Sequence, residues 1–115
     1  SADAIRLAER LDQLAAACDP HWKTDVQVIW ADAYYWPLPW YLRRFENVGF
    51  WTQMPRNPAA PVVIASPKYD AELTAQLNET HIMTDFFEIR PQVFTELWVR
   101  ADLWEDYLRK LGRID

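Results

Sequence analysis

The run Val62-Val-Ile-Ala65 constrains the fold of this chain more than any other segment. Its four apolar residues show no alternation with polar ones, which is typical of a strand that is covered on both faces. A strand of this kind belongs inside a layered α/β fold, and the other elements along the chain point to the same class of fold.

The remaining elements are predicted from apolar periodicity and from turn signals. Helical spacing predicts helices over residues 3–17, over residues 39–46, around Leu73, and from Asp102 towards Gly112. Short apolar runs predict strands over residues 26–30, 48–52, 61–66, 82–89 and 93–99. The last two runs alternate and flank Arg90-Pro-Gln92, which predicts an antiparallel hairpin. The order predicts one α/β domain over residues 1–115, with a mixed, mostly parallel sheet of about five strands, helices on both faces and a C-terminal antiparallel hairpin.

Length and composition exclude several classes of protein. At 115 residues the chain suits a single core. Its net charge of −5 and its lack of a long basic run argue against a nucleic-acid-binding surface. The single cysteine, Cys18, excludes an internal disulfide, and its place on a helical apolar stripe predicts a buried, unreactive thiol. No run of ~18 apolar residues is found, so a soluble fragment is predicted.

Residues 32–44 form an unusual segment with five aromatic residues, two prolines and two arginines. Trp36 and Leu38 each precede a proline, which favours extended backbone and a stiff approach to the following helix. Rings and guanidinium groups held in this way suit a sugar ring, a peptide or an anionic head group. The alternative is an aromatic-rich helix start that only packs.

The predicted position of this segment also favours binding. It follows the first strand, and ligands of open α/β sheets gather beyond the carboxyl ends of the strands. Trp40 and Arg44 are four residues apart and are expected to share a helix face, with Arg43 close by. Such a group could be a platform for a sugar or phosphate, or a cation–π pair that satisfies itself. Position and spacing thus give Asp32, Tyr35, Trp36, Trp40 and Arg43 as candidate binding residues, whereas Tyr41, Leu42 and Phe45 can share a core-facing stripe.

Other chemically interesting residues carry less weight. His21 and His81 have no neighbours at metal-ligand spacing, so neither a metal site nor another cofactor is predicted. Paired carboxylates can perform acid–base catalysis, but the acidic residues of the hairpin are expected on a solvated strand face; they are Asp85, Glu88 and Glu96. No nucleophile, base and orienting group can be assembled, so no catalytic residue is predicted.

Several motifs together resemble a known family. They are Asp32, Tyr35-Trp-Pro-Leu-Pro-Trp-Tyr-Leu-Arg43, Val48-Gly-Phe-Trp51, Arg90-Pro91 and Leu97-Trp-Val-Arg-Ala-Asp-Leu-Trp-Glu-Asp-Tyr-Leu108. The pattern resembles the C-terminal domain of polytopic membrane proteins in the GT-C glycosyltransferase superfamily, which are relatives of protein mannosyltransferases and archaeal flippase-associated proteins. The family pattern has glycine where this chain has Gln92, so a different hairpin turn is expected.

The resemblance implies a domain on the extracytoplasmic side of a membrane, excised from the C-terminus of a longer membrane protein. The parent would transfer a sugar from a polyprenyl-phosphate-linked donor, using acidic residues of its membrane portion. This chain would then be catalytically silent alone. Its partners would be the membrane-embedded portion of the same chain and a glycan, lipid-linked sugar or peptide acceptor. Trp36, Trp40, Tyr41 and Arg43 are the motif positions implied in binding, with Asp32 as a fifth.

Two other functions also fit the sequence. The excess of tryptophan and tyrosine also fits a freestanding carbohydrate- or peptide-binding module. A small independent α/β enzyme is the third possibility, although its catalytic residues cannot be assigned from spacing.

Overall fold

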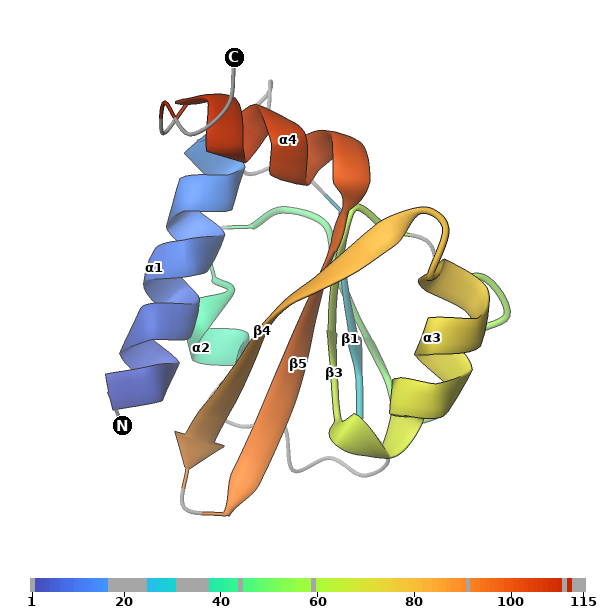
Figure 1. Ribbon diagram of the computed structural model, residues 1–115. Helices are drawn as coiled ribbons and strands as arrows, with labels where there is room; N and C mark the ends of the chain where they lie inside the picture. The colour runs from blue at the N-terminus through green and yellow to red at the C-terminus, as the bar shows by residue number, and fades with distance from the viewer. Residues whose placement is uncertain are drawn as a thin grey trace.

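The computed structural model describes residues 2–16, 25–30, 38–43, 45–58, 60–90, 92–110 and 112 (Figure 1). The elements are α1 (Ala2–Ala16), β1 (Val26–Ile29), α2 (Leu38–Tyr41), β2 (Val48–Trp51), β3 (Val62–Ala65), a 3-10 helix η1 (Pro67–Tyr69), α3 (Asp70–Leu77), β4 (His81–Arg90), β5 (Val93–Arg100) and α4 (Ala101–Lys110). All five predicted strands are present. Their ends differ from the predicted ones by one residue or none, which is the usual uncertainty of element boundaries.

The five strands form one mixed sheet in the order β2-β1-β3-β5-β4. β1 lies parallel to both β2 and β3, whereas β5 pairs antiparallel with both β3 and β4. The α/β class, the mixed sheet and the antiparallel hairpin are therefore confirmed. The prediction of a mostly parallel sheet is wrong, because the hairpin places β5 beside β3 and makes half of the strand pairings antiparallel.

β3 lies at the centre of this sheet, and all four of its residues are buried. Its side chains alternate between two clusters: Val62 and Ile64 belong to the first, and Val63 and Ala65 to the second. The absence of polar residues in this strand thus has the predicted cause, which is cover on both faces.

The first and larger cluster contains residues from α1, α4 and the segment after α2, together with one set of strand side chains. Its helical members include Leu7, Leu11 and Leu14 of α1 and Leu103 and Tyr107 of α4. The three leucines recur at helical spacing and are at most 1% exposed, so the predicted apolar stripe of α1 is its buried face.

The second cluster contains Leu73 and Leu77 of α3 and Tyr69 of η1, packed against strand residues that include Trp98. η1 begins after Ser66, whose hydroxyl accepts a hydrogen bond from the backbone N–H of Lys68. Figure 1 shows α3 beside β3 and away from α1, which agrees with their membership of different clusters.

α2 is shorter than predicted. The sequence predicts a helix over residues 39–46, but α2 is a single turn. After it, the backbone N–H of Phe45 donates a hydrogen bond to the carbonyl of Leu42 at 3.0 Å. Leu42 and Phe45 are 2% and 7% exposed, so both side chains are buried. They anchor the chain in the first cluster, and the backbone leaves the helix to reach β2 at Val48.

Gln92, in the turn between β4 and β5, has an unusual backbone conformation. Gln92 has a φ of 64°, the left-handed region that glycine favours. Its backbone N–H donates to Oε2 of Glu88 at 3.1 Å.

Candidate functional site

The structure describes only part of the predicted binding segment. Asp32, Tyr35 and Trp36 lie outside the described residues, and so does Arg44, which was expected to pair with Trp40. Tyr41 is the last residue of α2, and its side chain is likewise outside the description. Trp40 and Arg43 are described in full, and the structure brings these two together.

Trp40 projects from the single turn of α2 and is 54% exposed. The guanidinium carbon of Arg43 lies 4.1 Å from the centroid of its ring, which is a close cation–π contact. Nη1 of Arg43 also donates a hydrogen bond to the backbone carbonyl of Trp40 at 2.8 Å. Arg43 is therefore held in one orientation over the indole by a hydrogen bond and a ring contact.

Both side chains keep unused binding capacity at the surface. A guanidinium has five N–H donors, and the bond to the Trp40 carbonyl occupies one of them. Within the part of the chain that the structure describes, Arg43 forms no ion pair with a carboxylate. The pair can therefore offer N–H groups to an anion and apolar ring surface to a sugar.

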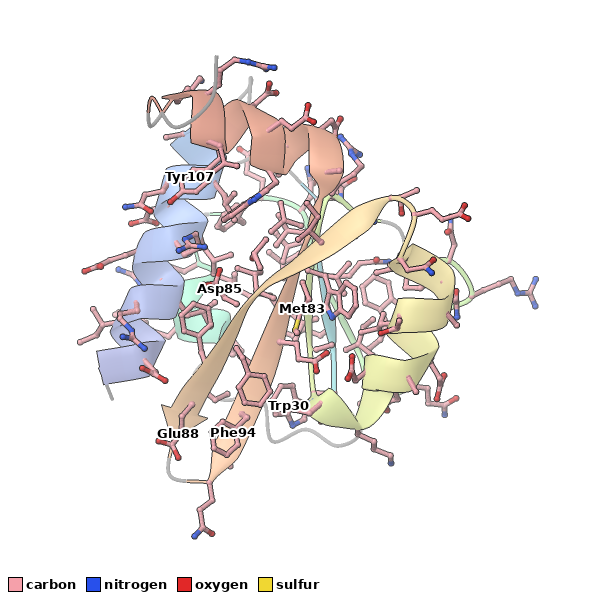
Figure 2. The ribbon with its side chains drawn as sticks, viewed as in Figure 1. Trp30, Met83, Asp85, Glu88, Phe94 and Tyr107 are labelled. Carbon is pink, nitrogen blue, oxygen red and sulfur yellow. The ribbon has the colours of Figure 1, made fainter. Side chains whose placement is uncertain are left out.

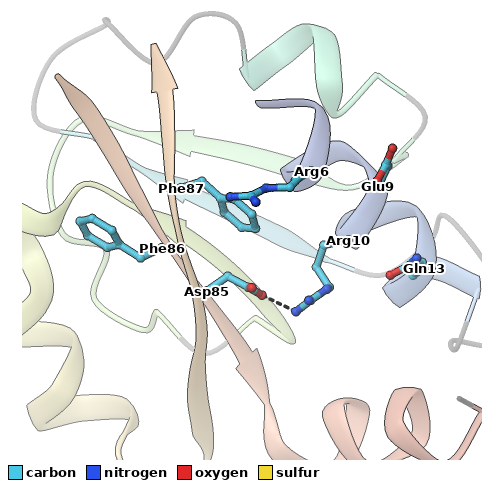
Figure 3. A pocket seen from close by; sticks show the side chains of 7 residues that line it. All are labelled: Arg6, Glu9, Arg10, Gln13, Asp85, Phe86 and Phe87. Atoms are coloured by element: carbon cyan, nitrogen blue, oxygen red, sulfur yellow. Dashed lines mark hydrogen bonds and ion pairs between the residues drawn. The ribbon is translucent and has the colours of Figure 1, made fainter. Parts of the chain in front are cut away.

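A cavity of about 370 Å³ lies between α1 and β4 (Figure 3). Nη1 of Arg10 pairs there with the carboxylate of Asp85. The guanidinium of Arg10 also lies 5.3 Å from the ring of Trp104 and 5.5 Å from that of Tyr107. Because its charge is already balanced, Arg10 serves to hold α1 and α4 against β4.

The carboxylates of the hairpin do not form an acid–base pair. Asp85 lies between β4 and α1, whereas Glu88 lies near the end of β4 beside Phe94 (Figure 2). The side chain of Asp85 is only 18% exposed and also accepts a hydrogen bond from the hydroxyl of Thr84 at 3.0 Å. The prediction of a solvated strand face is therefore wrong for Asp85.

That prediction is also wrong for Glu96, which is 3% exposed. The indole N–H of Trp98 donates to its Oε1 at 3.1 Å. Burial raises the pKa of Glu96; the bond from Trp98 opposes this shift, and the negative charge of Asp70 adds to it. The physical reason for its burial is that residues 95–99 of β5 are all buried, so this part of the strand is covered on both faces. Glu96 lies two residues from Trp98 and on the same face, which the second cluster covers.

His81 is a buried structural residue. Its Nε2 lies 2.8 Å from the carbonyl oxygen of Ala60, and its Nδ1 lies 2.7 Å from the hydroxyl of Thr80. A carbonyl only accepts, so Nε2 carries the proton and Nδ1 accepts from Thr80. Burial lowers the pKa of His81, which favours this neutral form. Among the described residues, no group of three or more potential metal ligands is found, and Cys18 and His21 lie outside them.

A second cavity, of about 730 Å³, lies at the amino ends of β1, β2 and β3, opposite to the end predicted for binding. Trp51 and Gly49 line it together with polar residues from several segments. Sequence reasoning missed this cavity, because its residues come from distant parts of the chain. The only local signal was a glycine two positions before a tryptophan in a short strand.

No protein-family profile, no characterised protein sequence and no solved structure matches this chain. None of the described helices is long and apolar enough to cross a membrane.

Proposed function

We propose that this chain is an accessory domain of a membrane glycosyltransferase that uses a polyprenyl-phosphate-linked sugar donor. In this proposal the domain is catalytically silent, faces the extracytoplasmic side, and positions the lipid-linked sugar or its acceptor against the membrane-embedded portion of the same protein. The observation that carries the proposal is the exposed indole of Trp40 with the guanidinium of Arg43 fixed above it.

The Trp40–Arg43 pair suits both halves of a phosphorylated saccharide. A guanidinium can give two parallel N–H bonds to one phosphate, and an indole can pack against the apolar face of a sugar ring. Arg43 is already oriented by its bond to the Trp40 carbonyl. Binding therefore avoids much of the cost of ordering a long side chain, which is about 0.5–1.5 kcal/mol.

The anchoring of this surface also supports a positioning role. Leu42 and Phe45, on either side of Arg43, are buried in the first cluster. The exposed pair therefore stands on a segment fixed to the core rather than on a free loop. We further propose that helices cover both faces of the sheet, with α1 and α4 over the first cluster and α3 over the second; the division of the core into two clusters supports this arrangement.

The first test is the coding sequence. The full reading frame should encode several hydrophobic spans before Ser1. A frame that begins near Ser1 would contradict the membrane-protein proposal.

The second test is the transferase activity of the full-length membrane protein. Trp40→Ala and Arg43→Ala should each lower kcat/KM by about tenfold, which corresponds to about 1.4 kcal/mol of lost binding free energy in the transition state. Arg43→Lys should recover part of the loss, because lysine keeps the charge but not the planar fork. Phe86→Ala is a matched control, since Phe86 is an exposed aromatic residue elsewhere (51% exposed). Unchanged activity in both alanine variants would contradict the proposal.

A further inference from the structure

We propose that the cavity at the amino ends of the parallel strands is a second binding site, which takes a neutral saccharide. It uses none of the residues of the Trp40–Arg43 pair, so it does not depend on the function proposed above. Its volume of about 730 Å³ is within the range of small-molecule sites. The side chains used in this argument are Asp25, Gln27, Glu46, Asn57, Trp51 and Arg100.

Trp51 provides a fixed aromatic surface in this cavity. Gly49 and Trp51 are two apart in β2, so they lie on the same side of the sheet. A Cβ atom at Gly49 would lie 2.3 Å from Cη2 of Trp51 and 2.4 Å from Cζ3. The six-membered ring therefore rests against the glycine backbone. Because Trp51 also lines the cavity, its remaining surface is available there.

The packing of Trp51 on Gly49 has a structural role as well. An aromatic ring that packs over a glycine stabilises an edge strand, and β2 is at the edge of the sheet. The same contact restricts the ring to one orientation before any ligand arrives. A sugar ring could then pack on the indole without the cost of ordering it.

Hydrogen bonds from β1 and from β4 hold the part of the chain that carries Asn57 and Ala60, which also line the cavity. Gln27 of β1 donates from Nε2 to the carbonyl of Asn57 at 3.3 Å and accepts at Oε1 from the backbone N–H of Ala60 at 3.1 Å. Nε2 of His81 donates to the carbonyl of Ala60 at 2.8 Å. The segment that carries the Asn57 side chain is thereby fixed relative to Trp51.

The charges of the cavity favour a neutral ligand. Among the described residues that line the cavity, Asp25 and Glu46 contribute two carboxylates, and the one cation, Arg100, is paired through Nε with Asp102 at 2.6 Å. Phosphates and carboxylates would be repelled. Sugar hydroxyl groups can both donate to carboxylates and bond to an amide such as Asn57. The combination of an indole, amides and carboxylates therefore points to an uncharged saccharide.

The test is an NMR titration of the isotope-labelled full chain with the disaccharides cellobiose, maltose, lactose and N,N′-diacetylchitobiose. At least one of them should shift the indole N–H signal of Trp51 saturably, with a Kd in the millimolar range. Asn57→Ala keeps the backbone carbonyl that Gln27 uses, so it should weaken binding by about tenfold without loss of fold. Gly49→Ala should also weaken binding, because its Cβ displaces the ring.

Two matched changes distinguish the outcomes. Asp25→Asn and Glu46→Gln should each weaken disaccharide binding by only about two- to threefold, since an amide oxygen still accepts from a hydroxyl group; complete loss of binding in either variant would mean that the carboxylate charge, which a neutral sugar does not need, holds the ligand, and would overturn the proposal. Trp40→Ala should have no effect, so the two sites can fail separately. The proposal is also overturned if no disaccharide shifts the Trp51 signal, or if binding is unchanged in Asn57→Ala.

Discussion

Glu96 and His81 are 3% and 6% exposed, and burial favours the uncharged form of each. Glu96 is held by the indole N–H of Trp98, and His81 by Ala60 and Thr80. Because burial raises the pKa of Glu96 and lowers that of His81, their contributions to stability depend on pH in opposite directions. Glu96 stabilises the fold when it is protonated, whereas His81 stabilises it when it is neutral.

The effect of Glu96 can be measured with Glu96→Gln. A folded-state pKa that is raised gives stability that is fully present below the unfolded value of about 4.3 and is lost as pH rises through the folded pKa. Glutamine stays neutral and can still accept the bond from Trp98 at its amide oxygen. The variant should therefore melt at a higher temperature than the wild type near neutral pH, and the difference should shrink in acid. Glu105→Gln, at an exposed position of α4, is the control. A lower melting temperature at neutral pH would contradict the assignment.

At the scale of elements, the apolar patterns of α1, β3 and the hairpin predicted these elements correctly, because each pattern reflects local contacts of one segment. They did not predict which side chains pack over the faces of β5, and the burial of Glu96 was missed for that reason. The end of α2 depends on where Leu42 and Phe45 reach the core. The cavity beside Trp51 requires four segments to meet, which no local pattern encodes.

Two variants in the segment around α2 distinguish a side chain that packs in the core from one that is exposed at the surface. Phe45→Ala removes a ring that is 7% exposed and should lower the free energy of unfolding by about 3–5 kcal/mol. Trp40→Ala removes a ring that is 54% exposed, so the loss should be about 0.5–1 kcal/mol, the size of an exposed cation–π contact with Arg43. Urea denaturation of the two variants measures both values. Equal losses would mean that Trp40 is a core residue.

At the scale of the whole molecule, the first and last helices of the described chain, α1 and α4, contact each other. Nζ of Lys110 in α4 donates to the carbonyl of Ala16 in α1 at 3.2 Å, and the hydroxyl of Tyr107 donates to Gln13 at 2.9 Å. Figure 1 shows the C-terminal end of α1 beside α4. Both helices also share the first cluster, so the N-terminal helix is part of the main core rather than an appendage.

This arrangement predicts one cooperative unfolding transition. Leu11 is fully buried, so Leu11→Ala should cost about 2–5 kcal/mol and shift the transitions followed by circular dichroism and by tryptophan fluorescence together. An earlier loss of helical signal, with the fluorescence transition unchanged, would show that α1 unfolds independently and would contradict this view of the core.

Calorimetric titration of the chain with mannose 1-phosphate, mannose and inorganic phosphate tests most directly whether Trp40 and Arg43 form a binding surface. Mannose 1-phosphate should bind more tightly than either of the other two, because it engages both the indole and the guanidinium. Its affinity should fall as salt is added, and Trp40→Ala and Arg43→Ala should each weaken it by about tenfold. The same affinity in the wild type and in both variants, or no binding at all, would contradict the proposed role of this pair.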